Sequence, residues 1–145
     1  MAEVGHRPRI LVSNRQSAPI DEAALVELAT ACLRGEGVDG CELSVSLVTE
    51  EEMADLHLRY AGEEGPTDVL SFPMDEVDEE GVRLLGDVVI APSVAATNNP
   101  GDPDAELRLL LVHGILHLLG HDHQGEEERA EMWARQQRYA GVRAP

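Results

Sequence analysis

The sequence predicts a single α+β domain spanning residues 1–145, in which a small β-sheet is covered by helices. Three observations support this prediction. The length of 145 residues is typical of one domain with a real core. A hydrophobic fraction of 43% excludes a wholly disordered chain, and no repeat, linker or low-complexity segment divides the sequence. Short segments typical of strands are interspersed with segments of helical periodicity.

The first half of the chain contains two predicted strands and two predicted helices. Arg9–Ser13 is a short β-rich run, and apolar residues recur at helical spacing over Asp21–Leu33, which begins with a capping residue. Leu43–Leu47 alternates apolar residues with serines, which is typical of a strand with one wet face. A threonine followed by three glutamates predicts the start of a short helix over Thr49–Tyr60.

The second half contains a predicted hairpin and two further helices. Asp68–Phe72 and Leu84–Ala91 are β-rich runs, and we expect the acidic stretch Met74–Glu80 between them to be a solvated loop. An apolar helix is predicted over Asp104–Leu119, because an Asp-Pro pair suits its N-cap and first position and a glycine follows its end. The last predicted helix is the amphipathic segment Glu126–Tyr139.

The charge of the chain restricts the kinds of partner that it binds. The net charge is −17, from 28 acidic residues and 11 basic residues, all of them arginine. Such a surface repels phosphate backbones on average and excludes a protein that coats nucleic acid nonspecifically. The charge is uneven, because residues 61–80 hold eight acids and no base whereas residues 1–20 hold three arginines and one acid.

The sequence also predicts a cytoplasmic protein with no membrane association. No run approaches the roughly 18 apolar residues of a membrane span. The first 20 residues lack the long apolar core of a secretory signal. Cys32 and Cys41 form no Cys-x-x-Cys pair, and we expect them to be reduced core residues.

Four of the six histidines lie within the segment HGILHLLGHDH, from His113 to His123. On a helix, His113 and His117 are one turn apart on the same face, a spacing that lets two imidazoles bind one ion. Gly120 can reverse the chain in the left-handed conformation and return His123 to that face. Three histidines with one open position are typical of a catalytic zinc site, whereas a structural zinc has four protein ligands.

The histidine spacing matches the metzincin protease signature except at one residue. The second histidine, a glycine and the last histidine follow His113 at positions +4, +7 and +10. The signature has a glutamate base directly after the first histidine, and here that residue is Gly114. A zinc ion lowers the pKa of a bound water to about 7 without this base, but amide hydrolysis also needs a proton for the leaving amine. A peptidase is therefore an alternative hypothesis, not the leading one.

Three motifs occur in one order along the chain: GPTDVLSFP at Gly65–Pro73, LLGDVVI at Leu84–Ile90 and HGILHLLGHDH at His113–His123. In these motifs the sequence resembles the YbeY family of bacterial metal-dependent endoribonucleases and ribosomal-RNA maturation factors. The resemblance implies a small mixed sheet of about four strands covered by about five helices. It also implies single-strand-specific RNA cleavage in small-subunit ribosomal-RNA maturation and ribosome quality control.

The same resemblance implies a cofactor and a set of partners. One Zn²⁺ ion per chain would be held by His113, His117 and His123 at the end of a core helix. The implied partners are single-stranded or ribosomal RNA and the ribosome or one of its proteins, with no DNA.

The candidate catalytic residues depart from the family's pattern. Many members place an arginine directly after an aromatic residue, six positions before the threonine of the TDVLSF motif. Here Tyr60 is followed by Ala61, and Arg59 precedes it. Because successive helical positions differ by about 100°, Arg59 and residue 61 of one helix point in nearly opposite directions. Arg59 is therefore either a displaced catalytic arginine that offsets charge on the transition state or a surface residue. His121 is either a proton donor or a turn residue.

Other candidates for substrate contact are few. Thr67, Asp68 and Ser71 lie in the motif strand, where an edge facing a groove would meet substrate. The chain has four aromatic residues, although single-stranded bases are bound largely by stacking. This scarcity favours a second hypothesis, a ribosome assembly factor with a structural zinc and no catalytic activity, whereas the open three-histidine arrangement favours the enzyme.

Overall fold

The computed structural model describes residues 7–63, 65, 67–121 and 125–141. They form four strands and five helices in the order β1 (Arg9–Asn14), α1 (Glu22–Gly35), β2 (Cys41–Leu47), α2 (Glu50–Ala61), β3 (Val69–Val77), β4 (Arg83–Ile90), α3 (Pro92–Asn98), α4 (Pro103–Leu118) and α5 (Glu126–Ala140). The strand order is β1-β2-β4-β3, and β3 alone runs antiparallel to its neighbour. The predicted α+β class and the mixed sheet are confirmed.

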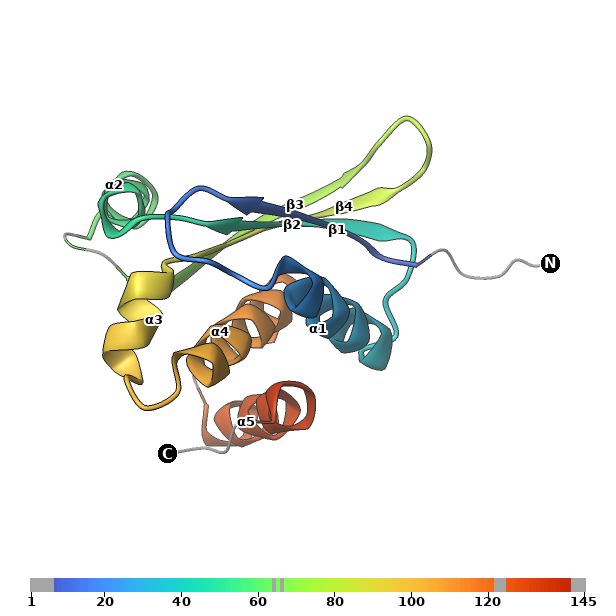
Figure 1. Cartoon of the computed structure of the whole chain (residues 1–145). Coiled ribbons are helices and arrows are strands. Elements are labelled where there is room, and N and C mark those ends of the chain that lie inside the picture. Colours follow the sequence, from blue (N-terminus) through green and yellow to red (C-terminus); the bar gives the residue numbers. More distant parts are fainter. Residues whose placement is uncertain (1–6, 64, 66, 122–124, 142–145) are drawn as a thin grey trace.

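The helices α1, α4 and α5 lie on one side of the sheet (Figure 1). α1 contacts β1, α4 contacts β3 and β4, and α5 packs against α4 on the side away from the sheet. The strand β2 alternates buried and half-buried residues along its length, as the serine pattern predicts. α4 is the central helix and buries most of its circumference, since the sheet, α1, α3 and α5 all contact it.

Three helices begin at the side-chain caps that the sequence indicates. Asp21, Thr49 and Asp102 each accept a hydrogen bond of 3.1 Å from a backbone N–H in the first turn of α1, α2 and α4. α2 ends at Gly62, whose φ of 71° is left-handed. These local interactions fix where the helices begin and end along the chain.

The structure differs from the predicted elements in two places. β3 continues to Val77, so the first part of the acidic stretch is strand and the predicted loop is shorter than expected. The pairing of β3 with β4 shifts register between Pro73 and Glu76, and a bulge on an edge strand tolerates both a proline and an exposed acid such as Glu76. The short helix α3 was also not predicted, and a proline at its first turn was the only local indication.

The expected core cysteines are confirmed. Cys32 and Cys41 are buried free thiols. Burial, with a smaller contribution from Glu36, raises the pKa of Cys32 to about 12. In the part of the chain that the structure describes, no helix has the length and apolar character needed to cross a membrane.

Candidate metal centre

His113 and His117 lie side by side on α4, facing the edge strand β3. Their ring centroids are 4.5 Å apart and the ring planes meet at 65°. Both rings are half-buried and line one cavity together with Ser71 and Pro73 of β3. The structure therefore brings together the first two of the three predicted ligands.

The third predicted ligand, His123, lies outside the described residues. Within residues 7–63, 65, 67–121 and 125–141, no three histidine, cysteine, aspartate or glutamate side chains form a group that could hold a metal ion. The complete three-histidine site therefore stays a prediction.

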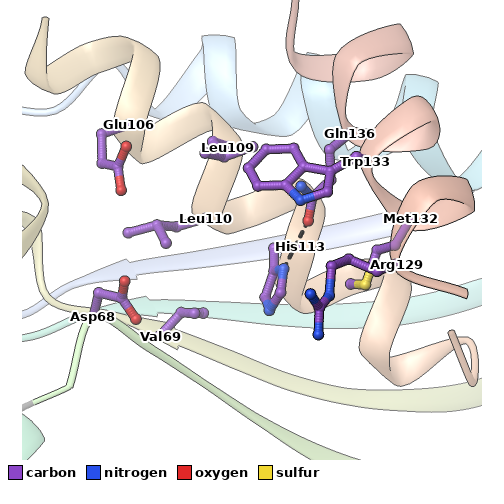
Figure 2. Close-up of a pocket in the computed structure, with 10 residues that line it drawn as sticks. All are labelled: Asp68, Val69, Glu106, Leu109, Leu110, His113, Arg129, Met132, Trp133 and Gln136. Atoms are coloured by element: carbon purple, nitrogen blue, oxygen red, sulfur yellow. Dashed lines mark hydrogen bonds between the residues drawn. The ribbon is translucent and has the colours of Figure 1, made fainter. Parts of the chain in front are cut away.

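Gln136 of α5 orients the ring of His113. His113 Nδ1 donates a hydrogen bond to Gln136 Oε1 at 2.7 Å, and Gln136 is only 3% exposed (Figure 2). Because an amide oxygen only accepts, Nδ1 carries the proton and Nε2 carries the lone pair. Binding of a metal ion through Nε2 requires this tautomer, and histidine ligands commonly donate their other N–H in this way. The donor set thus fits a divalent transition-metal ion.

Gln136 was not among the residues singled out from the sequence. It lies one turn after Met132 and one turn before Ala140, and all three are buried. A polar residue on the apolar face of an amphipathic helix is the signal that could have found it, because a buried amide needs a partner.

Packing against the sheet accounts for the glycine in place of the protease glutamate. A Cβ atom on Gly114 would lie 2.6 Å from Val88 Cγ1 and 3.2 Å from Ser71 Oγ. The Ser71 hydroxyl donates to the Gly114 carbonyl at 3.0 Å. Since α4 rests directly on β3 and β4 here, a glutamate base cannot occupy this position without displacing Val88 or the helix.

Two cavities meet at His113. The first, of about 380 Å³, lies between α4 and β3 and includes both histidines. The second, of about 390 Å³, lies between α4, α5 and the start of β3, and also includes His113. A molecule bound at this ring therefore has space on two sides.

Two acidic side chains line one end of the second cavity. Figure 2 shows Asp68 at the start of β3 and Glu106 of α4 at this end, and Arg129 and Trp133 of α5 near His113 at the other. Asn98 Nδ2 donates to Asp68 Oδ2 at 3.3 Å. Burial, and secondly the charge of Asp68, raises the pKa of Glu106, while a hydrogen bond from Asn98 opposes that rise.

Arg59 lies on the exposed side of α2, apart from both cavities. Its Nε is 3.6 Å from Asp55 Oδ2, and its side chain is 63% exposed. The helix continues through Ala61, so Arg59 and position 61 point in directions about 200° apart. Tyr60 packs edge-on against Phe72 at 5.2 Å, which places the last turn of α2 beside β3.

His121 belongs to a half-buried cluster centred on Glu36, at the end of α1. Its Nε2 is 3.0 Å from Glu36 Oε1, and the same carboxylate accepts from Arg135 at 2.6 and 2.7 Å and from the Tyr139 hydroxyl at 2.6 Å. Burial opposes ionisation of Glu36, but the hydrogen bonds from Tyr139, Arg135 and His121 hold its pKa below the usual value. The cluster ties the residue after the C-terminal turn of α4 to α1 and α5.

Comparison with known proteins identifies the family. The family model described as Endoribonuclease YbeY matches residues 11–141. A protein of Frankia alni named Endoribonuclease YbeY is 48% identical over 138 residues, which cover 86% of this chain and 76% of the relative. A Thermobifida fusca protein of the same name is 48% identical over 137 residues, which cover 86% and 87% of the two chains.

A solved structure shares the fold. The solution structure of TM1509 from Thermotoga maritima superimposes with a TM-score of 0.57 at 28% identity, covering 92% of this chain and 86% of that chain. The residues that match the family model include every buried core residue of the described structure and all three motifs noted in the sequence. The chain belongs to the YbeY endoribonuclease family.

Proposed function

We propose that the protein is a metal-dependent endoribonuclease that cleaves single-stranded RNA in small-subunit ribosomal-RNA maturation and ribosome quality control. Membership of the YbeY family supports RNA cleavage. The observation that most strongly supports a metal centre is the His113–Gln136 hydrogen bond, which holds the ring of His113 through Nδ1 at a centroid distance of 4.5 Å from the ring of His117. RNA maturation in the cytoplasm accords with this activity.

In this proposal His113, His117 and His123 hold one Zn²⁺ ion per chain. The bound ion would supply Lewis-acid polarisation of a phosphodiester oxygen and positive charge in an acidic protein. The protein's own residues orient the site: Gln136 fixes the His113 ring, and the cavities on either side of it admit the RNA strand.

Arg59 and His121 have separate roles in the proposed function. Arg59 contacts the RNA backbone outside the cavities, since its guanidinium is exposed and its surface pair with Asp55 is weak. For His121, the contact with Glu36 supports the role of a turn residue.

The net charge of the protein supports recruitment to the RNA by another molecule. A net charge of −17 opposes RNA binding at a distance, so the isolated protein binds RNA weakly and with strong salt dependence. A ribosomal protein or another part of the ribosome then brings the enzyme to its substrate.

Metal analysis combined with an RNA cleavage assay tests the proposal. Wild-type protein should bind one divalent ion per chain and cleave single-stranded RNA, whereas His113→Ala should lose both properties. His57→Ala is the matched control, because His57 of α2 is hydrogen-bonded to the Gly65 carbonyl, is paired with Glu63 and lines neither cavity. Full metal content and full activity in His113→Ala would contradict the site.

The same assay separates the alternatives. If metal-loaded wild-type protein cleaves no single-stranded RNA while His117→Ala is destabilised, the non-catalytic assembly factor is favoured. Metal-dependent digestion of casein by the wild-type protein would instead favour the peptidase.

A further inference from the structure

The cavity between α4, α5 and β3 has the features of a nucleotide subsite. We propose, on the basis of the proposed nuclease function, that it binds one unpaired base of the RNA substrate and prefers guanine. The cavity adjoins the candidate metal centre through His113, and the coordination of an ion does not account for its other walls (Figure 2).

The middle of the cavity suits a flat, apolar ring. Its volume of about 390 Å³ lies within the range of roughly 300–1,000 Å³ that small-molecule pockets occupy. Leu109 and Leu110 of α4 line it together with the indole of Trp133, which is half-buried and is the chain's only tryptophan. Stacking on such an aromatic ring is the usual way in which proteins hold unpaired bases.

The acidic end of the cavity selects for hydrogen-bond donors. Asp68 and Glu106 both line it, and their carboxylate oxygens accept hydrogen bonds. Guanine presents two adjacent N–H donors, at N1 and N2, on its Watson–Crick edge. Adenine and cytosine instead present an acceptor nitrogen beside their amino group, and uracil presents a single donor between two acceptors. Guanine is therefore the base that best complements this end.

The opposite end complements a phosphate group. Arg129 lies one helical turn before Trp133 and lines the cavity near His113. A nucleotide with its base edge at Asp68 and Glu106 would place its phosphate toward Arg129 and the candidate metal centre. The polarity of the cavity, with acids at one end and a cation at the other, thus matches the polarity of a nucleotide.

Fluorescence of Trp133 gives a test that does not depend on cleavage. GMP, AMP, CMP and UMP are titrated into the metal-loaded full-length protein. We expect saturable quenching with a Kd for GMP roughly tenfold lower than for the other nucleotides, since charge-assisted hydrogen bonds are lost with the others. Asp68→Asn and Glu106→Gln should remove this preference, whereas Asp104→Asn, an exposed acid of α4, should retain it.

Cleavage supplies a second measurement. Single-stranded oligonucleotides with one guanine moved along an otherwise uniform sequence should be cut at a fixed distance from that guanine. Trp133→Leu should raise KM more than it lowers kcat, and Trp133→Phe, which restores an aromatic ring, should recover KM. Equal quenching by all four nucleotides, or none, together with a cleavage pattern unchanged in Asp68→Asn and Glu106→Gln, would overturn the subsite.

The two proposals fail in different ways. Cleavage that depends on His113 but is indifferent to base would remove the subsite and leave the proposed function intact. Selective binding of GMP without cleavage of any RNA would retain the subsite and overturn the proposed function.

Discussion

Gln136 of α5 accepts a 2.7 Å hydrogen bond from Nδ1 of His113 of α4, and this contact selects the tautomer of a candidate metal ligand. The same face of α5 presents Arg129, Met132 and Trp133 to the neighbouring cavity. α5 therefore does more than cover the core, because its docking against α4 sets both the ligand geometry and one wall of the candidate substrate site.

Replacing Gln136 with methionine should weaken metal binding. The variant keeps the side-chain length but leaves the Nδ1 proton of His113 without its acceptor, so we expect affinity to fall about 10- to 100-fold. Competition with a chelator of known affinity measures this change. Gln137→Met, on the exposed side of the same helix, is the control, and Gln136→Glu should retain affinity because a carboxylate still accepts. Equal metal affinity in Gln136→Met and wild type would show that the contact does not tune the ligand.

Replacing Gly114 with alanine should destabilise the fold. The added methyl group would sit 2.6 Å from Val88 Cγ1, and overpacking of this kind costs about 1–3 kcal/mol. Denaturant unfolding measures the loss. Gly101→Ala is the control, since the nearest atom to a Cβ there is 3.8 Å away. Adding Val88→Ala to Gly114→Ala should recover part of the stability, and the absence of any recovery would argue against this clash as the cause.

Replacing Glu36 with glutamine should lower stability in a pH-dependent way. The pKa of Glu36 is lower in the folded protein than its usual value of 4.5, so its stabilising contribution is present above that value and is lost as pH falls through the folded pKa. At neutral pH we expect a loss of about 2 kcal/mol, because the bonds to Arg135, Tyr139 and His121 involve a charged acceptor.

Thermal unfolding of wild type and variant across the pH range measures this effect. The difference in Tm should stay constant from neutral pH to about 5 and shrink below 4.5, where wild-type Glu36 also becomes protonated. Glu27→Gln, an exposed acid on the same helix, should change Tm little at any pH. A difference that persists unchanged under acidic conditions would mean that the charge of Glu36 is not responsible.

The features that the sequence predicted are local ones. Asp21, Thr49 and Asp102 each cap a helix through a residue three positions away, and the one-turn spacing of His113 and His117 puts both rings on one face. Such interactions depend on backbone geometry within a single element, so residue type and spacing were enough to find them.

The features that it did not predict depend on packing between distant segments. Gln136 meets His113 across 23 positions, and Glu36 meets Tyr139 across 103. Neither contact follows from periodicity, because each depends on how α5 docks against the rest of the domain. The length of β3 was underestimated for a similar reason. Its acids and Pro73 indicate a loop locally, yet the strand continues because it pairs with β4 around a bulge.

Replacing Arg59 with glutamine should reduce the salt dependence of RNA binding. In the proposed role Arg59 neutralises one backbone phosphate, and for single strands each such contact contributes about 0.7 to the slope of log affinity against log salt. Its pairing with Asp55 at 3.6 Å is exposed and exchanges readily for a phosphate. Titrations of a fluorescent single-stranded RNA at several salt concentrations measure the slope.

Arg34→Gln, which removes an exposed arginine paired with Asp39 at the end of α1, should leave this slope unchanged. An unchanged slope and an unchanged cleavage rate in Arg59→Gln would identify Arg59 as a surface residue, the other role that its displacement from position 61 allows.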